Sequence, residues 1–267
     1  MKKITNLLLV AAAAVCAASC SLFELDNYDA PAETLFGKVT DAAGNPVLTD
    51  QGSEGIRVRL TETSWEGNVT PLDFYCRPDG TFNNTKVFEG DYNIRIDGPF
   101  IPLVRSTQDG ILLSDESKNA HVKGQTEVNF IVEPFLHVEL VGIPQAAGGK
   151  ITANVKVTRG VSKEDFRSKV EPMGNYSDDF LNVTDIQLFV SYSSSVGYRA
   201  RDDRWSSSIE YAGASFEDLL GTEVSISSKG AIPSGRKVYV RAAARINYAT
   251  EGNRRWNYSE PIEVYLP

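Results

Sequence analysis

The chain has 267 residues, of which 42% are hydrophobic and 23% charged, a globular rather than a disordered composition. Its formal charge is −8 and its pI about 5.0, which disfavours a nucleic-acid partner held through phosphate contacts. Three cysteines cannot form a framework of several disulfides, and two histidines exclude a His-rich metal site. The length suits one or two domains.

The N-terminal segment has the pattern of an export signal. Two lysines precede the apolar run 7–15 (LLLVAAAAV), which is too short to span a bilayer as a helix. Small residues stand directly before Cys20, and the tripeptide ASC resembles the end of a bacterial lipobox. The resemblance implies a signal peptide over 1–19 and a lipid on Cys20, which would be the protein's only contact with a membrane. Ordinary secretion after an A-x-A-like cleavage site is the alternative.

Residues 20–33 predict a lipidated cysteine followed by a flexible tether, because the segment is polar and acidic and contains no basic residue. Acidic residues soon after the lipidated cysteine also resemble the surface-export signal of Bacteroidetes lipoproteins. That resemblance implies an outer-membrane protein exposed at the cell surface.

Cys76 is the only cysteine left once the signal peptide is removed and Cys20 is lipidated, so no disulfide can form within the chain. It ends the apolar stretch 72–76, and we expect it to be a small buried hydrophobe rather than a nucleophile.

Residues 34–133 predict a first β-domain. Short β-rich runs are separated by turn residues about every ten positions, and strict alternation over 56–60 places three apolar side chains on one face. Three motifs follow in order: G-x-V-x-D-x-x-G-x-P at 37–46, D-G-x-F at 79–82 and E-G-x-Y at 89–92. Together they resemble the carboxypeptidase-regulatory or transthyretin-like β-sandwich, whose members usually serve as spacers or accessory modules.

Residues 134–267 predict a second β-domain. V-R-x-x-A at 240–244 and S-x-P-x-x-V at 259–264 are similar to the last two strands of fibronectin type III domains. Residues 162–169 and 215–220 look like short helical insertions, the second capped by Ser215. The predicted fold is therefore all-β, with two sandwiches in series: a transthyretin/carboxypeptidase-regulatory-like one and then a fibronectin type III/Ig-like one.

The complete layout resembles a family of Bacteroidetes lipoproteins of unknown function that accompany SusC/SusD-type outer-membrane importers. The resemblance implies capture of a glycan or another nutrient at the cell surface, with SusC/SusD-type proteins as partners. It supplies no catalytic residues.

Catalytic motifs are missing from the sequence. The chain has no G-x-S-x-G elbow, no phosphate-binding G-x4-G-K-[ST] loop and no D-x-[DN]-x-[DN]-G calcium loop. We therefore predict a protein that is not an enzyme and that has neither a metal nor a cofactor. A glycoside hydrolase stays a remote alternative, because a catalytic carboxylate pair is defined by distance across a cleft and not by spacing along the chain.

Aromatic residues in polar segments give the predicted binding site. A flat ring can cover the apolar face of a sugar while neighbouring polar groups bond its hydroxyls. The predicted platform consists of Tyr198, Trp205, Tyr248, Trp256 and Tyr258, with Trp65 as an alternative in the first domain. The competing interpretation is that these rings belong to the core.

The predicted function is a non-enzymatic surface lipoprotein that binds a carbohydrate or another nutrient as an accessory to an outer-membrane uptake system. A structural or adhesion scaffold that binds a protein is the alternative, and it would present an exposed apolar patch instead of a polar aromatic platform.

Overall fold

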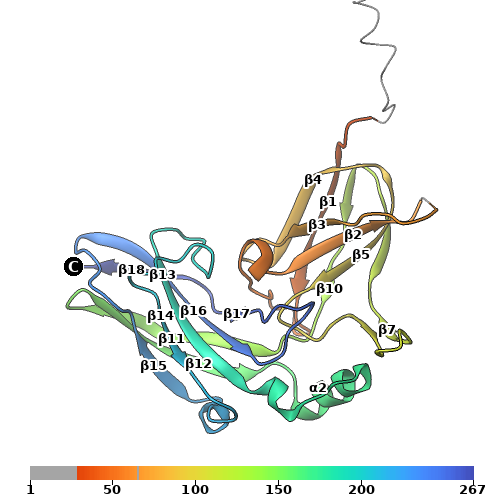
Figure 1. Cartoon of the computed structure of the whole chain (residues 1–267). Coiled ribbons are helices and arrows are strands. Elements are labelled where there is room, and N and C mark those ends of the chain that lie inside the picture. Colours follow the sequence, from red (N-terminus) through yellow and green to blue (C-terminus); the bar gives the residue numbers. More distant parts are fainter. Residues whose placement is uncertain (1–28, 65) are drawn as a thin grey trace, which may run out of the picture.

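The computed structural model describes residues 29–64 and 66–267, so the predicted signal peptide, Cys20 and Trp65 lie outside the described residues. Two β-sandwiches lie next to each other and meet at an angle (Figure 1). The prediction of an all-β fold is confirmed. Within the part of the chain that the structure describes, no helix is long and apolar enough to cross a membrane.

The first sandwich consists of two sheets that enclose one apolar core. One sheet contains β10 (Phe130–Ile131), β1 (Glu33–Thr40), β4 (Thr81–Val87) and β9 (Gln125–Glu127). The other contains β3 (Leu72–Tyr75), β2 (Arg57–Glu62), β5 (Gly90–Asp97) and β8 (Lys118–Val122). A hairpin of β6 (Val104–Ser106) and β7 (Leu112–Asp115), and a 3-10 helix, η1 (Gly52–Glu54), complete it. Alternation along β2 and β5 buries one face of each strand, as predicted for 56–60.

Gly37 shows why the first predicted motif needs glycine. A Cβ atom at this position would lie 1.8 Å from the carbonyl oxygen of Val128 and 2.7 Å from the ring of Phe82. No side chain fits between these two groups, so β1 can pack here only with glycine.

Cys76 is buried in the first core, which confirms the prediction. Burial, and to a smaller extent the nearby Asp79 carboxylate, raise the pKa of its thiol well above the ordinary value, and only the thiolate is nucleophilic. We expect the protein from Ser21 onward to resist alkylation by iodoacetamide at pH 8 and to be labelled fully in 6 M guanidinium chloride. Mass spectrometry of the labelled chain checks this, and rapid labelling of the folded protein would contradict the buried position.

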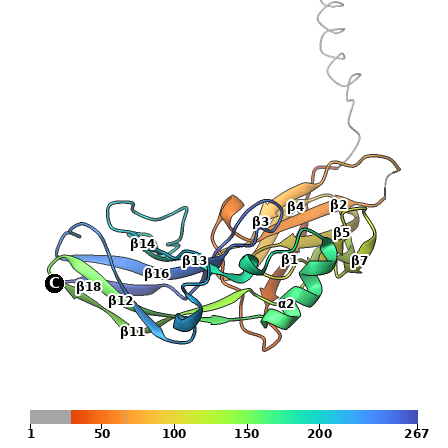
Figure 2. The same ribbon diagram turned by 60° about the horizontal axis from the view of Figure 1, so that its bottom comes forward.

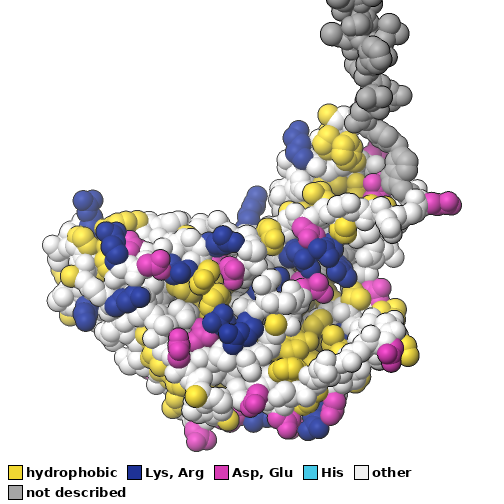
Figure 3. All heavy atoms as spheres, viewed as in Figure 1, with side chains coloured by type: hydrophobic (Ala, Val, Ile, Leu, Met, Phe, Trp, Pro, Cys, Tyr) yellow, Lys and Arg dark blue, Asp and Glu magenta, His cyan; other side chains and the backbone are white. Residues whose placement is uncertain are grey.

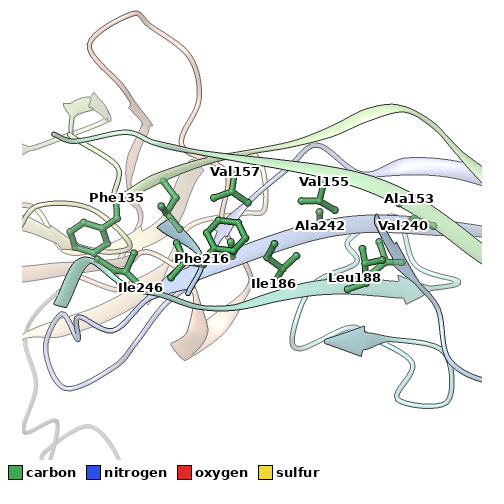
Figure 4. Packing of buried hydrophobic residues seen from close by; sticks show 14 of the residues in the cluster. Phe135, Ala153, Val155, Val157, Ile186, Leu188, Phe216, Val240, Ala242 and Ile246 are labelled. Atoms are coloured by element: carbon green, nitrogen blue, oxygen red, sulfur yellow. The ribbon is translucent and has the colours of Figure 1, made fainter. Parts of the chain in front are cut away.

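The second sandwich also has two sheets. One contains β11 (Leu136–Ala147), β12 (Lys150–Arg159) and β15 (Glu223–Ser227). The other contains β14 (Ser207–Glu210), β13 (Val183–Ser191), β16 (Arg236–Ile246), β17 (Asn257–Tyr258) and β18 (Ile262–Leu266). Their facing side chains interdigitate in a core that includes Val155, Ile186 and Ala242 (Figure 4).

The central strands β13 and β16 are buried on both faces. Ala242, Ala243 and Ala244 are all fully buried, although neighbouring side chains of a strand point to opposite faces. One face belongs to the main core, and the other carries a second cluster that contains Phe189 and Trp256. A strand buried on both sides gives a continuous apolar run rather than an alternating pattern.

A helical insertion separates β12 from β13. Helix α2 (Lys163–Val170) begins after Ser162, whose hydroxyl accepts a 2.9 Å hydrogen bond from the Asp165 amide. The predicted helix is thus confirmed, and two 3-10 helices, η2 (Glu171–Met173) and η3 (Asp178–Leu181), follow it. Figures 1 and 2 place α2 at the end of the second sandwich that is nearest the first.

The second predicted insertion is a single 3-10 turn, η4 (Glu217–Leu219), which begins after Phe216. Ser215 does not cap it, so that detail of the prediction is wrong: the turn starts one residue later, and no side chain caps its first amides.

Buried hydrogen bonds join the two sandwiches. The guanidinium of Arg241, on β16, donates to the carbonyl oxygens of Thr49 (2.8 Å) and Pro78 (3.2 Å) in the first sandwich. The Thr250 hydroxyl donates to the Gly98 carbonyl at 2.8 Å. Each of these donors is buried, so the contacts fix one sandwich against the other and do not merely bring two surfaces together.

Candidate functional site

The predicted aromatic platform is not exposed. Trp256 and Tyr258 are only 4% and 5% accessible and belong to the second cluster, on the face of the β13/β16 sheet turned away from the main core. Trp256 stacks on Tyr198 with ring centroids 4.7 Å apart, and its Nε1 donates to Asp185 Oδ1 at 3.1 Å. The predicted exposure is therefore wrong for these rings, because β17 folds back onto β16 and buries them beside the first sandwich.

Trp205 is also core. It is 3% accessible, belongs to the main core on the other face of that sheet, and packs edge-on against Tyr192 at 5.1 Å. Trp205 and Trp256 thus lie in separate clusters and cannot share one binding surface. Tyr198 is half-buried. Its ring stacks on Trp256, and the Arg201 guanidinium lies 4.0 Å from the centroid of the Tyr198 ring.

Two platform tyrosines line cavities: Tyr258 lines one of about 130 Å3, and the larger is lined by Tyr248. Its ring contacts Phe135 at 5.7 Å and Phe166 and Phe180 at 5.3 Å each, and burial raises the pKa of its hydroxyl. The cavity lies at the junction of the sandwiches and has a volume of about 170 Å3. The structure therefore groups Tyr198, Trp256 and Tyr258 in one buried cluster and places Trp205 and Tyr248 with the main core instead.

A larger cavity, of about 390 Å3, lies within the helical insertion. Part of α2 forms one wall, and η3 with the segment before it forms another. Its lining residues are Arg159, Lys163, Glu164, Arg167, Tyr176, Asp178, Leu181 and Asn182. We call this the α2 cavity.

Charges around the α2 cavity largely neutralise each other in pairs. Arg159 and Lys163 both reach Glu217 at 2.6 Å, and Arg167 pairs with Glu171 at 3.0 Å. Burial would raise the pKa of Glu217, but hydrogen bonds from the two cations hold it below the ordinary value. The walls thus carry fixed donors and acceptors without a large excess of either charge.

Tyr176 supplies the aromatic surface of the α2 cavity. Its ring packs against Phe166 (6.4 Å) and Phe180 (5.9 Å), and the Arg167 guanidinium lies 5.3 Å from its centroid. These contacts hold the ring in place before any ligand arrives. The sequence did mark 162–169 as a departure from the sandwich pattern, but nothing in the linear pattern showed that Tyr176 would fold back against it.

Within residues 29–64 and 66–267, no three His, Cys, Asp or Glu side chains gather closely enough to hold a metal ion. The cavities instead offer what a small polar ligand needs, namely a fixed ring and several hydrogen-bonding groups.

Residues 33–133 match the family described as "Protein of unknown function (DUF3823) N-terminal domain". The crystal structure of a DUF3823 family protein from Bacteroides uniformis ATCC 8492 is 66% identical in sequence, with a TM-score of 0.87, and the match covers 89% of this chain and 100% of that one. The chain belongs to the DUF3823 family.

Two more distant structures share the fold. A "putative carbohydrate binding protein" from Bacteroides uniformis ATCC 8492 is 19% identical, with a TM-score of 0.61 and coverage of 88% of this chain and 100% of that one. A DUF3823 family protein from Parabacteroides merdae ATCC 43184 is 20% identical, with a TM-score of 0.58 and the same coverage. No curated protein matches the chain. None of the names of these three structures describes an enzyme.

Proposed function

We propose that this DUF3823 protein binds a carbohydrate in the α2 cavity and does not alter it chemically. The observation that carries the proposal is the position of one fixed tyrosine ring, Tyr176, among paired charged groups. A ring of this kind packs on the apolar face of a sugar, while carboxylate, guanidinium and amide groups bond its hydroxyls. Nearly balanced charge suits a neutral sugar.

The size of the cavity supports a small ligand. Its volume of about 390 Å3 lies within the range of small-molecule sites. The name of the structurally similar protein from Bacteroides uniformis points to the same class of ligand, although the likeness at 19% identity establishes only the fold.

The predicted export signal suggests where in the cell the protein would bind sugar. A protein lipidated at Cys20 and exposed on the outer membrane would hold sugar beside a SusC/SusD-type importer and raise its local concentration there. This part of the proposal rests on the sequence pattern of residues 1–33.

Tyr176→Ala is expected to weaken sugar binding about tenfold or more, because the ring supplies the stacking surface. Affinity electrophoresis of the protein from Ser21 onward, through gels that contain a panel of polysaccharides, measures this. The control is Tyr265→Ala, which removes an exposed tyrosine from β18.

Retardation that survives in Tyr265→Ala and disappears in Tyr176→Ala, with unchanged circular dichroism, supports the proposal. Equal retardation of both variants would show that the sugar binds elsewhere.

A scaffold function is the second candidate. At the β6/β7 hairpin, Ile111, Leu112 and Leu113 are 65%, 58% and 43% exposed in succession, which is typical of a surface that a protein partner covers. If no polysaccharide retards the protein, carbohydrate binding is contradicted and this hairpin becomes the surface to test.

A further inference from the structure

The junction cavity is built by both sandwiches. Residues of β5 and of the segment after it form one side, and the segment after β16 together with η2 forms the other. The residues of this cavity that the argument uses are Arg95, Asp97, Met173, Tyr248 and Glu251. Figure 3 shows Lys and Arg side chains gathered over β2 and β3, next to an apolar area between the two sandwiches.

Arg95 is an unpaired cation. It lies directly opposite Arg59 in the β2/β5 register, and like charges in that position destabilise a sheet. Arg59 is neutralised by Asp73, with its Nη2 2.6 Å from Asp73 Oδ2. Among the described residues, Arg95 forms neither a hydrogen bond nor an ion pair, and its Nε is buried without a partner.

The carboxylates of the cavity are already shared with another cation. Asp97 Oδ2 lies 2.6 Å and Glu251 Oε2 3.3 Å from the same nitrogen of Arg57. The buried Arg255 is electrostatically coupled to Asp97 as well. Asp97 and Glu251 are thus already shared with Arg57 and Arg255. Arg95 is electrostatically coupled to the more distant Asp73 and Asp115, but among the described residues no carboxylate forms a direct ion pair with it.

Glu251 occupies a backbone position that favours glycine. Its φ is +50°, and Gly252 follows with φ +79°, in a tight turn closed between Thr250 and Asn253. Asn or Gly is usual in both central positions of such a turn. A strained non-glycine residue at the rim of a cavity is typical of a functional site, and here the strain holds a carboxylate at the cavity.

We propose that the junction cavity binds the carboxylate of an acidic sugar, with Arg95 as its counter-ion. Arg95 would donate charge-assisted hydrogen bonds to the carboxylate. Tyr248, held by its three aromatic neighbours, and Met173 form the apolar wall against which the ring of the sugar packs. Asp97 and Glu251 accept hydrogen bonds from its hydroxyls. The inference extends the proposed function to a second site, and it shares with that function only the assumption that the ligand is a sugar.

Arg95→Gln tests this assignment. Isothermal titration of the protein from Ser21 onward with polygalacturonate is expected to show binding that falls at least tenfold in this variant. The control, Arg236→Gln, removes an exposed arginine at the start of β16. Arg95→Lys, which keeps the charge but loses the planar fork, should lie between wild type and Arg95→Gln.

Two further probes identify the ligand. Fully methyl-esterified polygalacturonate, which lacks the charge, should bind at least tenfold more weakly than the acid form. Sodium sulfate tests whether the site simply binds an inorganic oxyanion. If sulfate displaces polygalacturonate when its concentration equals that of the uronate units, the site selects an oxyanion and not a sugar. The proposal then fails.

Folding must be intact for the test to count. Because Arg95 forms no hydrogen bond or ion pair among the described residues and faces Arg59, Arg95→Gln should unfold at the wild-type temperature or above it. Equal binding by wild type and Arg95→Gln, or by the acid and the ester, would overturn the proposal. Binding to neutral polysaccharide that is unchanged in Tyr176→Ala would overturn the proposed function instead, so the two failures are distinguishable.

Discussion

Replacing Arg241 with methionine is expected to lower the free energy of unfolding by about 3–5 kcal/mol, because each buried carbonyl oxygen that loses its donor costs about 1–3 kcal/mol. The Arg241 side chain is 1% accessible. Its guanidinium nitrogens donate hydrogen bonds to four carbonyl oxygens, with N···O distances of 2.7 to 3.4 Å. The acceptors are Thr49, Pro78, Val196 and Ser259. Methionine fills much of the same volume but donates no hydrogen bond, so the three buried acceptors, Thr49, Val196 and Ser259, lose a donor.

Urea denaturation measures the effect, and Arg236→Met is the matched control on the same strand, where the side chain is exposed. The control should change the free energy of unfolding by less than about 0.5 kcal/mol. Burial lowers the pKa of the Arg241 guanidinium, which shows that the surroundings disfavour its charge. If Arg241→Met is as stable as the control, the hydrogen bonds at this junction contribute nothing net to the fold.

Trp256→Ala is expected to destabilise the protein by about 3–5 kcal/mol, the usual cost of truncating a buried large aromatic side chain. The variant would lose the stacking on Tyr198, the Arg245 guanidinium 4.2 Å from the indole centroid and the hydrogen bond to Asp185. Thermal and urea unfolding measure the loss. A near-neutral result would contradict the buried position of the indole.

The milder Trp256→Phe separates the hydrogen bond from the packing. Burial raises the pKa of Asp185, but hydrogen bonds from Gln187, Arg245 and Trp256 outweigh it and leave the pKa below its ordinary value of 3.8. A carboxyl group whose pKa is lowered in the folded state stabilises that state above its unfolded pKa, and this contribution disappears as the pH falls through the folded pKa. The difference in stability between wild type and Trp256→Phe should therefore be full at pH 7 and shrink below pH ~4.

The buried position of Trp256 limits what its substitutions can reveal about ligand binding. Loss of sugar binding in Trp256→Ala would report a damaged junction between the sandwiches and not a lost contact with the ligand. Tyr176 and Arg95 are better probes, because each lines a cavity and neither is deeply buried in a core cluster.

Local pattern determined the strands, one helix and the burial of Cys76. Strict alternation over 56–60 fixes which face of β2 is buried, since the side-chain period of a strand is two. Ser162 marks the start of α2, since its side chain and the amides that it caps are neighbours in sequence. The hydrophobic character around Cys76 was likewise sufficient to place it in the core.

Tertiary structure alone decided where the aromatic residues and the cavities lie. Segment 248–258 looks like an exposed loop because it is polar, but Arg255 and Asn257 are buried. Arg255 donates to Thr250 within the segment, and Asn257 Nδ2 donates to the Pro99 carbonyl across the junction. The unpaired charge of Arg95 depends on the register of β2 against β5, which brings Arg59 opposite it. Both facts depend on contacts between residues distant in sequence, and a local pattern carries no information about such partners.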